Sequence, residues 1–172
     1  MLSKAVEGRA AEILTRVGGA ERALSFAAFM VLIAVVFADV VSRELTGTGL
    51  HWARQAGVYA NLFVVMFGIG IASAHGAHLR PRFADHWLPS GWEPALIRIQ
   101  EGLMALFCLG FAAVAASVVM DSYAFGERSV VLRIAIWPFQ AIIPLVFLIA
   151  AFRHAAYAAF SSLRPNEVEQ EA

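Results

Sequence analysis

The chain contains four long apolar runs, which are separated by more polar stretches. The runs cover residues 23–41, 56–74, 102–120 and 134–152. A helix needs roughly 20 mostly apolar residues to cross the hydrocarbon core of a bilayer, and each run has about that length. A membrane β-strand would instead alternate polar and apolar side chains. The pattern therefore predicts an all-α integral membrane protein with four transmembrane helices.

Two shorter segments have the mixed pattern of helices that lie in the membrane interface. Residues 3–17 place apolar side chains on one rough stripe with charged residues elsewhere. Residues 79–92 mix aromatic and charged residues between Pro81 and Pro89. We expect a short interfacial amphipathic helix in each, and a disordered polar tail at 165–172. No repeat or second domain is visible, so residues 1–172 are expected to form a single membrane domain.

The charge distribution predicts which side of the membrane the termini face. Four spans put both termini and the loop after the second span on one side. That side carries nine Lys and Arg residues (Lys4, Arg9, Arg16, Arg22, Arg80, Arg82, Arg98, Arg153, Arg164), and the other side carries four (Arg43, Arg54, Arg128, Arg133). Because Lys and Arg are enriched in cytoplasmic loops, both termini are expected to be cytoplasmic.

The composition agrees with a membrane protein and argues against other classes. Of the 172 residues, 60% are apolar and 15% are charged, against about 45–50% and about 25% in soluble domains. The 13 basic and 13 acidic residues cancel, which leaves no basic excess to attract nucleic acid. The single cysteine, Cys108, has no partner for a disulfide within the chain.

Polar residues inside the spans are few. Asp39 and Arg43 are spaced to form an ion pair on one helical face near the outer interface. Asn61, Ser117 and Gln140 are typical of hydrogen bonds between helices. No nucleophile with a base, phosphate-binding loop or metal-ligand spacing is present, so we expect no catalytic, cofactor or metal site.

Small residues at four-residue spacing favour close helix packing in the second span. Gly68, Ala72 and Gly76 fall on one face of it. Helix association in lipid depends on close van der Waals contact between small residues. We expect this face to press against another helix, in this chain or in a partner.

Three stretches give the chain a resemblance to a known family. The first span ends in 41–43 (VSR), and a Gly-containing loop leads to Trp52, which opens the second span. The second span closes on 68–79 (GIGIASAHGAHL), and an amphipathic stretch ending in Leu88-Pro89 follows. The fourth span contains 136–144 (IWPFQAIIP). In these features the chain resembles the small membrane subunit of tripartite ATP-independent periplasmic (TRAP) transporters.

The resemblance also has departures. Arg54 and Gln55 stand where the family commonly has acidic residues, and Arg82 stands near the position of a family aspartate. Any partner contact that uses those acids would need other chemistry in this chain.

The resemblance implies a non-catalytic scaffold subunit in the bacterial inner membrane. Its partners would be a large membrane subunit of about twelve spans, a periplasmic substrate-binding protein and membrane lipids. The large subunit would carry the sodium and substrate sites for symport of a small organic anion, moving as an elevator.

From the resemblance and the packing pattern together we predict a partner interface that includes Arg43, Trp52, Gly68, Ala72, Gly76 and His78. Trp87, Trp92 and Trp137 are predicted to anchor the chain at the membrane surface, because tryptophan favours the headgroup region.

Two other functions stay open on the sequence alone. His75, His78 and His154 lie near the same side of the membrane and could ligate haem in the membrane anchor of an oxidoreductase. A self-contained small exporter acting as a dimer is the other alternative, although membrane-embedded charge is scarce. A haem absorbance band, or transport by the chain alone in liposomes, would reveal either one.

Overall fold

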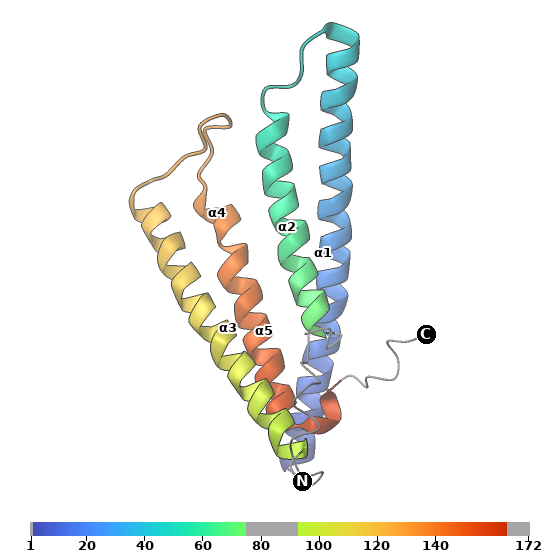
Figure 1. Cartoon of the computed structure of the whole chain (residues 1–172), viewed down its shortest axis with the longest axis vertical. Coiled ribbons are helices and arrows are strands. Elements are labelled where there is room, and N and C mark those ends of the chain that lie inside the picture. Colours follow the sequence, from blue (N-terminus) through green and yellow to red (C-terminus); the bar gives the residue numbers. More distant parts are fainter. Residues whose placement is uncertain (1, 75–92, 165–172) are drawn as a thin grey trace.

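The computed structural model describes residues 2–74 and 93–164, and its main elements are all helices (Figure 1). They are α1 (Leu2–Thr46), α2 (Ala53–Ala74), α3 (Glu93–Ala124), α4 (Trp137–Gln140) and α5 (Ile142–Ala159), followed by the 3-10 turn η2 (Ser161–Leu163). Four helical stretches, with α4 and α5 counted together, are long and apolar enough to cross a membrane. This confirms the prediction of an all-α membrane protein with four spans.

Helix α1 differs from the expected short helix at 3–17 followed by a separate span. It is one unbroken helix of 45 residues, about 68 Å long at 1.5 Å per residue. Gly18 and Gly19 lie where we expected the break, yet both are helical. Two glycines cost a helix about 2 kcal/mol, and here that cost does not end α1.

The other helix boundaries also extend or shift the predicted spans. Helix α3 begins at Glu93 rather than at 102, and α2 begins at Ala53 rather than at 56. The fourth span begins at Trp137 rather than at 134, because Pro138 occupies the first turn and the preceding loop forms a β-bridge between Arg128 and Ala135. The expected segments at 79–92 and 165–172 lie outside the described residues.

Proline chemistry explains why the fourth span is divided into α4 and α5. Ala141 has helical dihedral angles and its N–H donates to the carbonyl of Trp137, so the chain direction continues. Pro144 has no N–H, so it cannot bond the carbonyl of Gln140 four residues earlier. The Gln140 side chain, expected to bond between helices, has a buried Oε1 without a hydrogen-bond partner in the described part of the chain.

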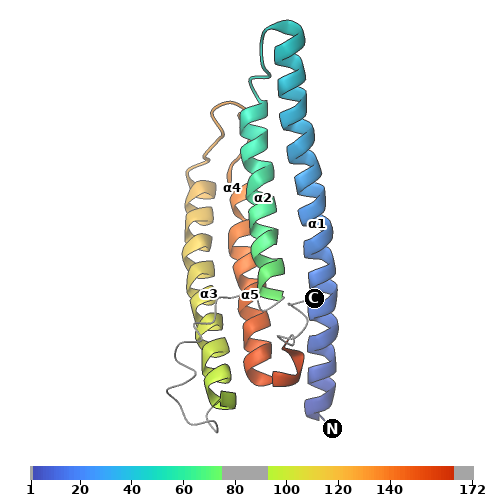
Figure 2. The ribbon, with the colours of Figure 1, turned by 45° about the vertical axis from the view of Figure 1, so that its right-hand side comes forward.

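The helices pack as two antiparallel pairs. Helix α1 packs along α2, α3 packs along α5, and the pairs meet through α2 and α5. We call the end where α1 begins and α5 ends the terminal end, and the opposite end the loop end. In Figure 1 the two pairs approach each other at the terminal end and separate toward the loop end. Figure 2 shows α1 extending beyond α2 at both ends.

Small apolar clusters hold these contacts together. Phe67 on α2 packs with Ile142 and Val146 on α5. Cys108 on α3 packs with Ala150 and Ala151 on α5. Helix α5 is therefore the central element, in contact with both α2 and α3.

Candidate functional site

Two consecutive residues on α5, Arg153 and His154, are buried at the terminal end with only 1% and 3% of their surface exposed. They lie in the last turns of α5, where the apolar run gives way to polar residues. A charged or polar side chain in such a position needs partners, because burial without them is unfavourable. Their partners come from the other three long helices.

Arg153 connects α5 to α1 and α2. Its Nη2 donates to Glu21 Oε2 at 2.7 Å, and its Nη1 donates to the backbone carbonyl of Gly70 at 2.6 Å. Glu21 is itself only 3% exposed. The pair therefore joins the first and last long helices through a buried, charge-assisted contact.

Gly70 is the residue that lets α1 and α2 approach at this level. A Cβ built at Gly70 would lie 2.7 Å from Glu21 Cδ. We expected another helix to pack closely against the face that contains Gly68. A Cβ at Gly68, however, would meet nothing within 4 Å. The close contact within the chain thus uses a glycine two residues from the predicted one.

His154 connects α5 to α2 and α3. Its Nε2 lies 2.9 Å from Ser73 Oγ, and its Nδ1 lies 2.6 Å from Glu101 Oε2. The other carboxylate oxygen of Glu101 is 3.6 Å from Arg164 Nε, beyond the end of η2. We call Glu21, Ser73, Glu101, Arg153 and His154 the terminal polar cluster.

Ser73, His154 and Glu101 follow the order of a nucleophile, a base and an orienting acid. Ser73 is only 1% exposed, however, so its hydroxyl is closed to a substrate. Each contact in the series also joins two different helices. The geometry therefore fits helix–helix attachment better than acyl transfer.

The geometry also bears on haem and metal binding. An axial histidine needs a ring nitrogen for iron, and both ring nitrogens of His154 already have protein partners. His75 and His78 lie outside the described residues. Within the described ranges, no group of three or more His, Cys, Asp or Glu residues could hold a metal ion.

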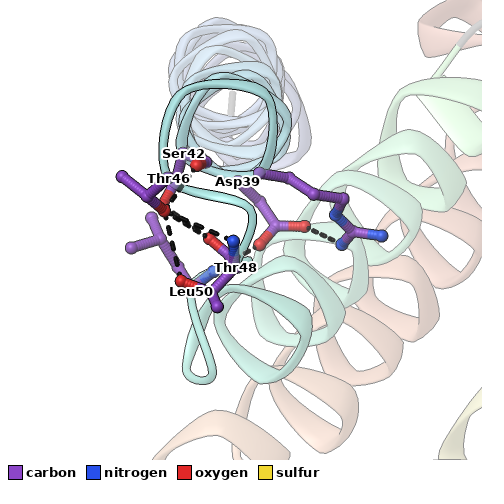
Figure 3. A network of polar contacts seen from close by, with 6 residues as sticks. Asp39, Ser42, Thr46, Thr48 and Leu50 are labelled. Atoms are coloured by element: carbon purple, nitrogen blue, oxygen red, sulfur yellow. Dashed lines mark hydrogen bonds and ion pairs between the residues drawn. The ribbon is translucent and has the colours of Figure 1, made fainter.

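The loop end contains the predicted ion pair of Asp39 and Arg43, with 2.7 Å between Asp39 Oδ2 and Arg43 Nη2. Asp39 Oδ1 also accepts the backbone N–H of Leu50 at 2.7 Å. Figure 3 shows Asp39 beside the turn after α1, where Ser42, Thr46 and Thr48 form a second set of hydrogen bonds. Asp39 thus fixes the turn as well as the arginine.

Glycines allow the turn to follow this path. Gly47 adopts a left-handed φ of 73° and its N–H donates to the carbonyl of Arg43, which ends α1. A Cβ on Gly49 would lie 2.7 Å from Asp39 Oδ1. The loop that resembled the family's Gly-containing loop is therefore built around the Asp39 carboxylate.

A cavity of about 530 Å³ lies beside this turn. It is lined by Asp39, Arg43, Gly49, Leu50, His51, Arg54, Gln55, Val58, Val130 and Val131. Gln55 Oε1 accepts the N–H of Val131 at 3.1 Å, which ties the start of α2 to the loop before α4. Gln55, one of the departures from the family pattern, therefore has a contact within the chain.

The structure does not gather the predicted interface residues into one site. Arg43 and Trp52 are both exposed at the loop end, whereas Gly68 and Ala72 are half-buried further along α2. Trp137 is 38% exposed and contacts Tyr123 edge to face. Gly76, His78, Trp87 and Trp92 lie outside the described residues.

The terminal polar cluster is what our reading of the sequence missed. Glu21, Arg153 and His154 stand at the edges of apolar runs. We counted Arg153 only among the basic residues of its side and considered His154 only as a haem ligand. A usable signal was present, since the four-span topology places Glu21, Glu101, Arg153 and His154 at the same level. Matching the two acids with the two basic residues would have predicted contacts there.

Comparison with known proteins agrees with the architecture. The family described as "Tripartite ATP-independent periplasmic transporters, DctQ component" matches residues 32–164, which include α2 to α5 and the second part of α1. No individual curated protein matches the chain. The family match covers well over half of the chain, and four membrane-spanning helices accompany it. The chain belongs to the DctQ family and is a small membrane subunit of a TRAP transporter of the bacterial inner membrane.

Proposed function

We propose that this subunit is a non-catalytic scaffold that holds the large permease subunit while the large subunit moves substrate. The large subunit would contain the sodium and substrate sites and move as an elevator. A periplasmic binding protein would deliver a small organic anion to it. The family membership supports this division of labour, and two properties of the chain fit the scaffold part.

The observation that carries the proposal is the exposure of α1. In its most apolar stretch no residue is buried inside the chain, although that stretch is long enough to cross the bilayer. Phe26, Phe29 and Phe37 are 66%, 46% and 67% exposed. A surface this apolar is available for lipid or for another membrane protein.

Rigidity is the second property that fits a scaffold. Arg153 and His154 attach α5 to the other three long helices by side-chain contacts of 2.6–2.9 Å. A support for a moving subunit has to keep its own helices in place during the movement. The terminal polar cluster supplies such attachments at one end of all four spans.

The loop end is our proposed place of assembly, with Arg43 and Trp52 as contact residues. Both are exposed, and Arg43 is held in position by Asp39. Gly68 and Ala72, with Gly76 and His78, would form a second contact along α2. Gly68 has open space beside it, which supports packing against a partner helix.

The first test is to purify the chain in mild detergent from its native membrane and identify what accompanies it. A colourless complex with a large, many-span protein in equal amount is expected. Recovery of the chain alone as a transport-competent dimer would support the exporter, and a haem absorbance band would support the oxidoreductase anchor. Either result would overturn the scaffold proposal.

The interface is tested by changing Arg43 and Trp52 together to alanine. We expect a lower yield of the large subunit in the purified complex. The matched control is the double change Arg128→Ala and Trp137→Ala, which alters the same residue types in the other loop at this end and at the start of α4. Equal yields from both variants would remove Arg43 and Trp52 from the interface while leaving the scaffold proposal intact.

A further inference from the structure

A second cavity, of about 430 Å³, lies at the terminal end between α1, α2 and the end of α5. Its lining combines apolar and polar residues: Ala11, Leu14, Thr15, Gly18, Arg22, Ile71, Ala74, Arg153, Tyr157, Ser162 and Leu163. It lies beside the terminal polar cluster but has its own polar groups. Two of these, Arg22 and Tyr157, have no part in that cluster.

Arg22 is a cation without a counterion inside the described residues. Its side chain makes no hydrogen bond or ion pair there, unlike Arg16, which pairs with Glu12 at 2.6 Å. The neighbouring acid, Glu21, pairs with Arg153 through Oε2, and its buried Oε1 has no hydrogen-bond partner in the described residues, Arg22 included. The positive charge of Arg22 is therefore available to the cavity.

Tyr157 provides a second donor in the cavity wall. Its side chain is only 5% exposed, yet its hydroxyl has no hydrogen-bond partner among residues 4–74 and 95–164. Its oxygen is not among the fully buried polar atoms that lack a partner, so the hydroxyl reaches the surface of the cavity that Tyr157 lines. A ligand atom that accepts a hydrogen bond would supply the missing partner.

The acids near the cavity have other partners and do not pair with Arg22 or Tyr157. Glu21 faces Arg153, and Glu7 accepts the hydroxyl of Ser162 at the cavity rim. A third acid, Glu101, pairs with His154 and Arg164. Within the described residues, no hydrogen bond or ion pair joins these three acids to Arg22 or to the Tyr157 hydroxyl. Arg22 and Tyr157 both line this cavity as hydrogen-bond donors, and phosphate oxygens suit both donors.

The position of the cavity indicates where the phosphate comes from. Arg22 directly precedes the first apolar run, and Ala74 and Tyr157 lie at the ends of α2 and α5. These residues mark the level where the spans leave the hydrocarbon. Leu14, Ile71 and Leu163 add an apolar wall on the same cavity. A phospholipid presents a phosphate next to apolar chains at this level.

We propose that this cavity binds the phosphodiester group of a membrane phospholipid, with Arg22 and Tyr157 as its donors. The site lies within this one subunit, between the first helix and the last. It does not depend on the proposed contacts with a large subunit. Occupancy would place a lipid headgroup beside the pair of Glu21 and Arg153.

The test uses the full chain alone, stripped of lipid in detergent and titrated with phosphatidylglycerol, with bound lipid counted by native mass spectrometry. We expect one lipid to remain bound most tightly. Changing Arg22→Gln and Tyr157→Phe together should weaken that binding about tenfold, because two hydrogen bonds to the phosphate are lost. Diacylglycerol, which lacks the phosphate, should not occupy the site.

The matched control is Arg98→Gln, which removes another exposed arginine without a described partner, on α3 and away from this cavity. It should leave lipid binding unchanged. Equal weakening by Arg98→Gln, or no weakening by the double variant, would overturn the proposal. Displacement of the lipid by millimolar inorganic phosphate would overturn the lipid assignment and identify the ligand as free phosphate. Circular dichroism of each variant confirms that the helices are intact.

Discussion

The two ends of the bundle each contain an acid–arginine pair with the same separation of 2.7 Å between the charged atoms. At the terminal end, Glu21 and Arg153 are 132 residues apart in sequence and almost fully buried. At the loop end, Asp39 and Arg43 are four residues apart, and the arginine side chain is 64% exposed. Similar geometry thus occurs in two very different environments.

The environment decides what each pair contributes. An exposed pair one turn apart on a helix adds little, since water and salt screen it and both partners remain solvated when it breaks. A buried pair also gains little relative to apolar residues, but losing one partner leaves an uncompensated buried charge. We therefore expect the terminal pair to be intolerant of single changes and the loop pair to tolerate them.

The largest effect is expected for Arg153→Met. It leaves the Glu21 carboxylate buried without a partner and removes the donor to the Gly70 carbonyl, at a cost of about 3–5 kcal/mol in the free energy of unfolding. Unfolding in mixed detergent micelles, followed by circular dichroism, measures this. Adding Glu21→Leu should restore part of the loss, because the uncompensated charge is then gone. A double variant as unstable as Arg153→Met would contradict this account.

Gly70→Ala should come next, with a loss of about 1–3 kcal/mol from overpacking. The new methyl group would lie against the Glu21 carboxylate and force it away from Arg153. Gly68→Ala on the same helix is the control, since its methyl group would meet nothing within 4 Å. The same unfolding measurement on the isolated chain should find Gly68→Ala neutral or slightly stabilising. Equal losses at both positions would show that the close approach at Gly70 is unimportant.

A smaller loss is expected for Ser73→Ala. It removes the contact of 2.9 Å with His154 but leaves the histidine bonded to Glu101. Hydrogen bonds between membrane helices average about 0.6 kcal/mol, with a maximum of about 1.7 kcal/mol. Ser117→Ala serves as the control, since Ser117 bonds only the carbonyl of Val114 within its own helix. A loss no greater than that of the control would remove this contact from the attachment of α2 to α5.

The smallest effect on stability is expected for Arg43→Gln, at about 0.3–0.5 kcal/mol, as for other pairs four residues apart on a helix. The loss should shrink further at high salt, because the arginine is exposed. Unfolding at low and high salt measures both. A loss as large as that of Arg153→Met would show that burial does not make the terminal pair more sensitive to single changes than the loop pair.

The features visible in the sequence were those that depend on local pattern. Four apolar runs of the right length predicted the four spans, and the spacing of Asp39 and Arg43 predicted their ion pair. Contacts between distant residues were not visible in this way. Glu21 and Arg153 look like ordinary interfacial charges until the helices are brought together, because their burial is a property of the assembled bundle.

The start of the chain also differs from what its local pattern favoured. The apolar stripe and the charged residues at 3–17 favoured a short interfacial helix, separate from the span expected at 23–41. The structure instead continues α1 through both segments and through Gly18 and Gly19 between them. The low helix propensity of glycine costs little free energy per residue. In proteins most of the stability of a helix comes from packing, so two glycines need not end it.

The contact between Glu21 and Arg153 also bears on how the chain is made. Ribosomes deliver α1 to the membrane first, whereas Arg153 is synthesised 132 residues later. During that interval Glu21 has to stay hydrated at the membrane surface, which its position at the edge of the first apolar run allows. This contact between α1 and α5 can therefore form only after the end of α5 has been synthesised. A chain that lacks the end of α5 would leave Glu21 on α1 and Glu101 on α3 without Arg153 and His154. Such a chain would expose two acids that the folded bundle buries.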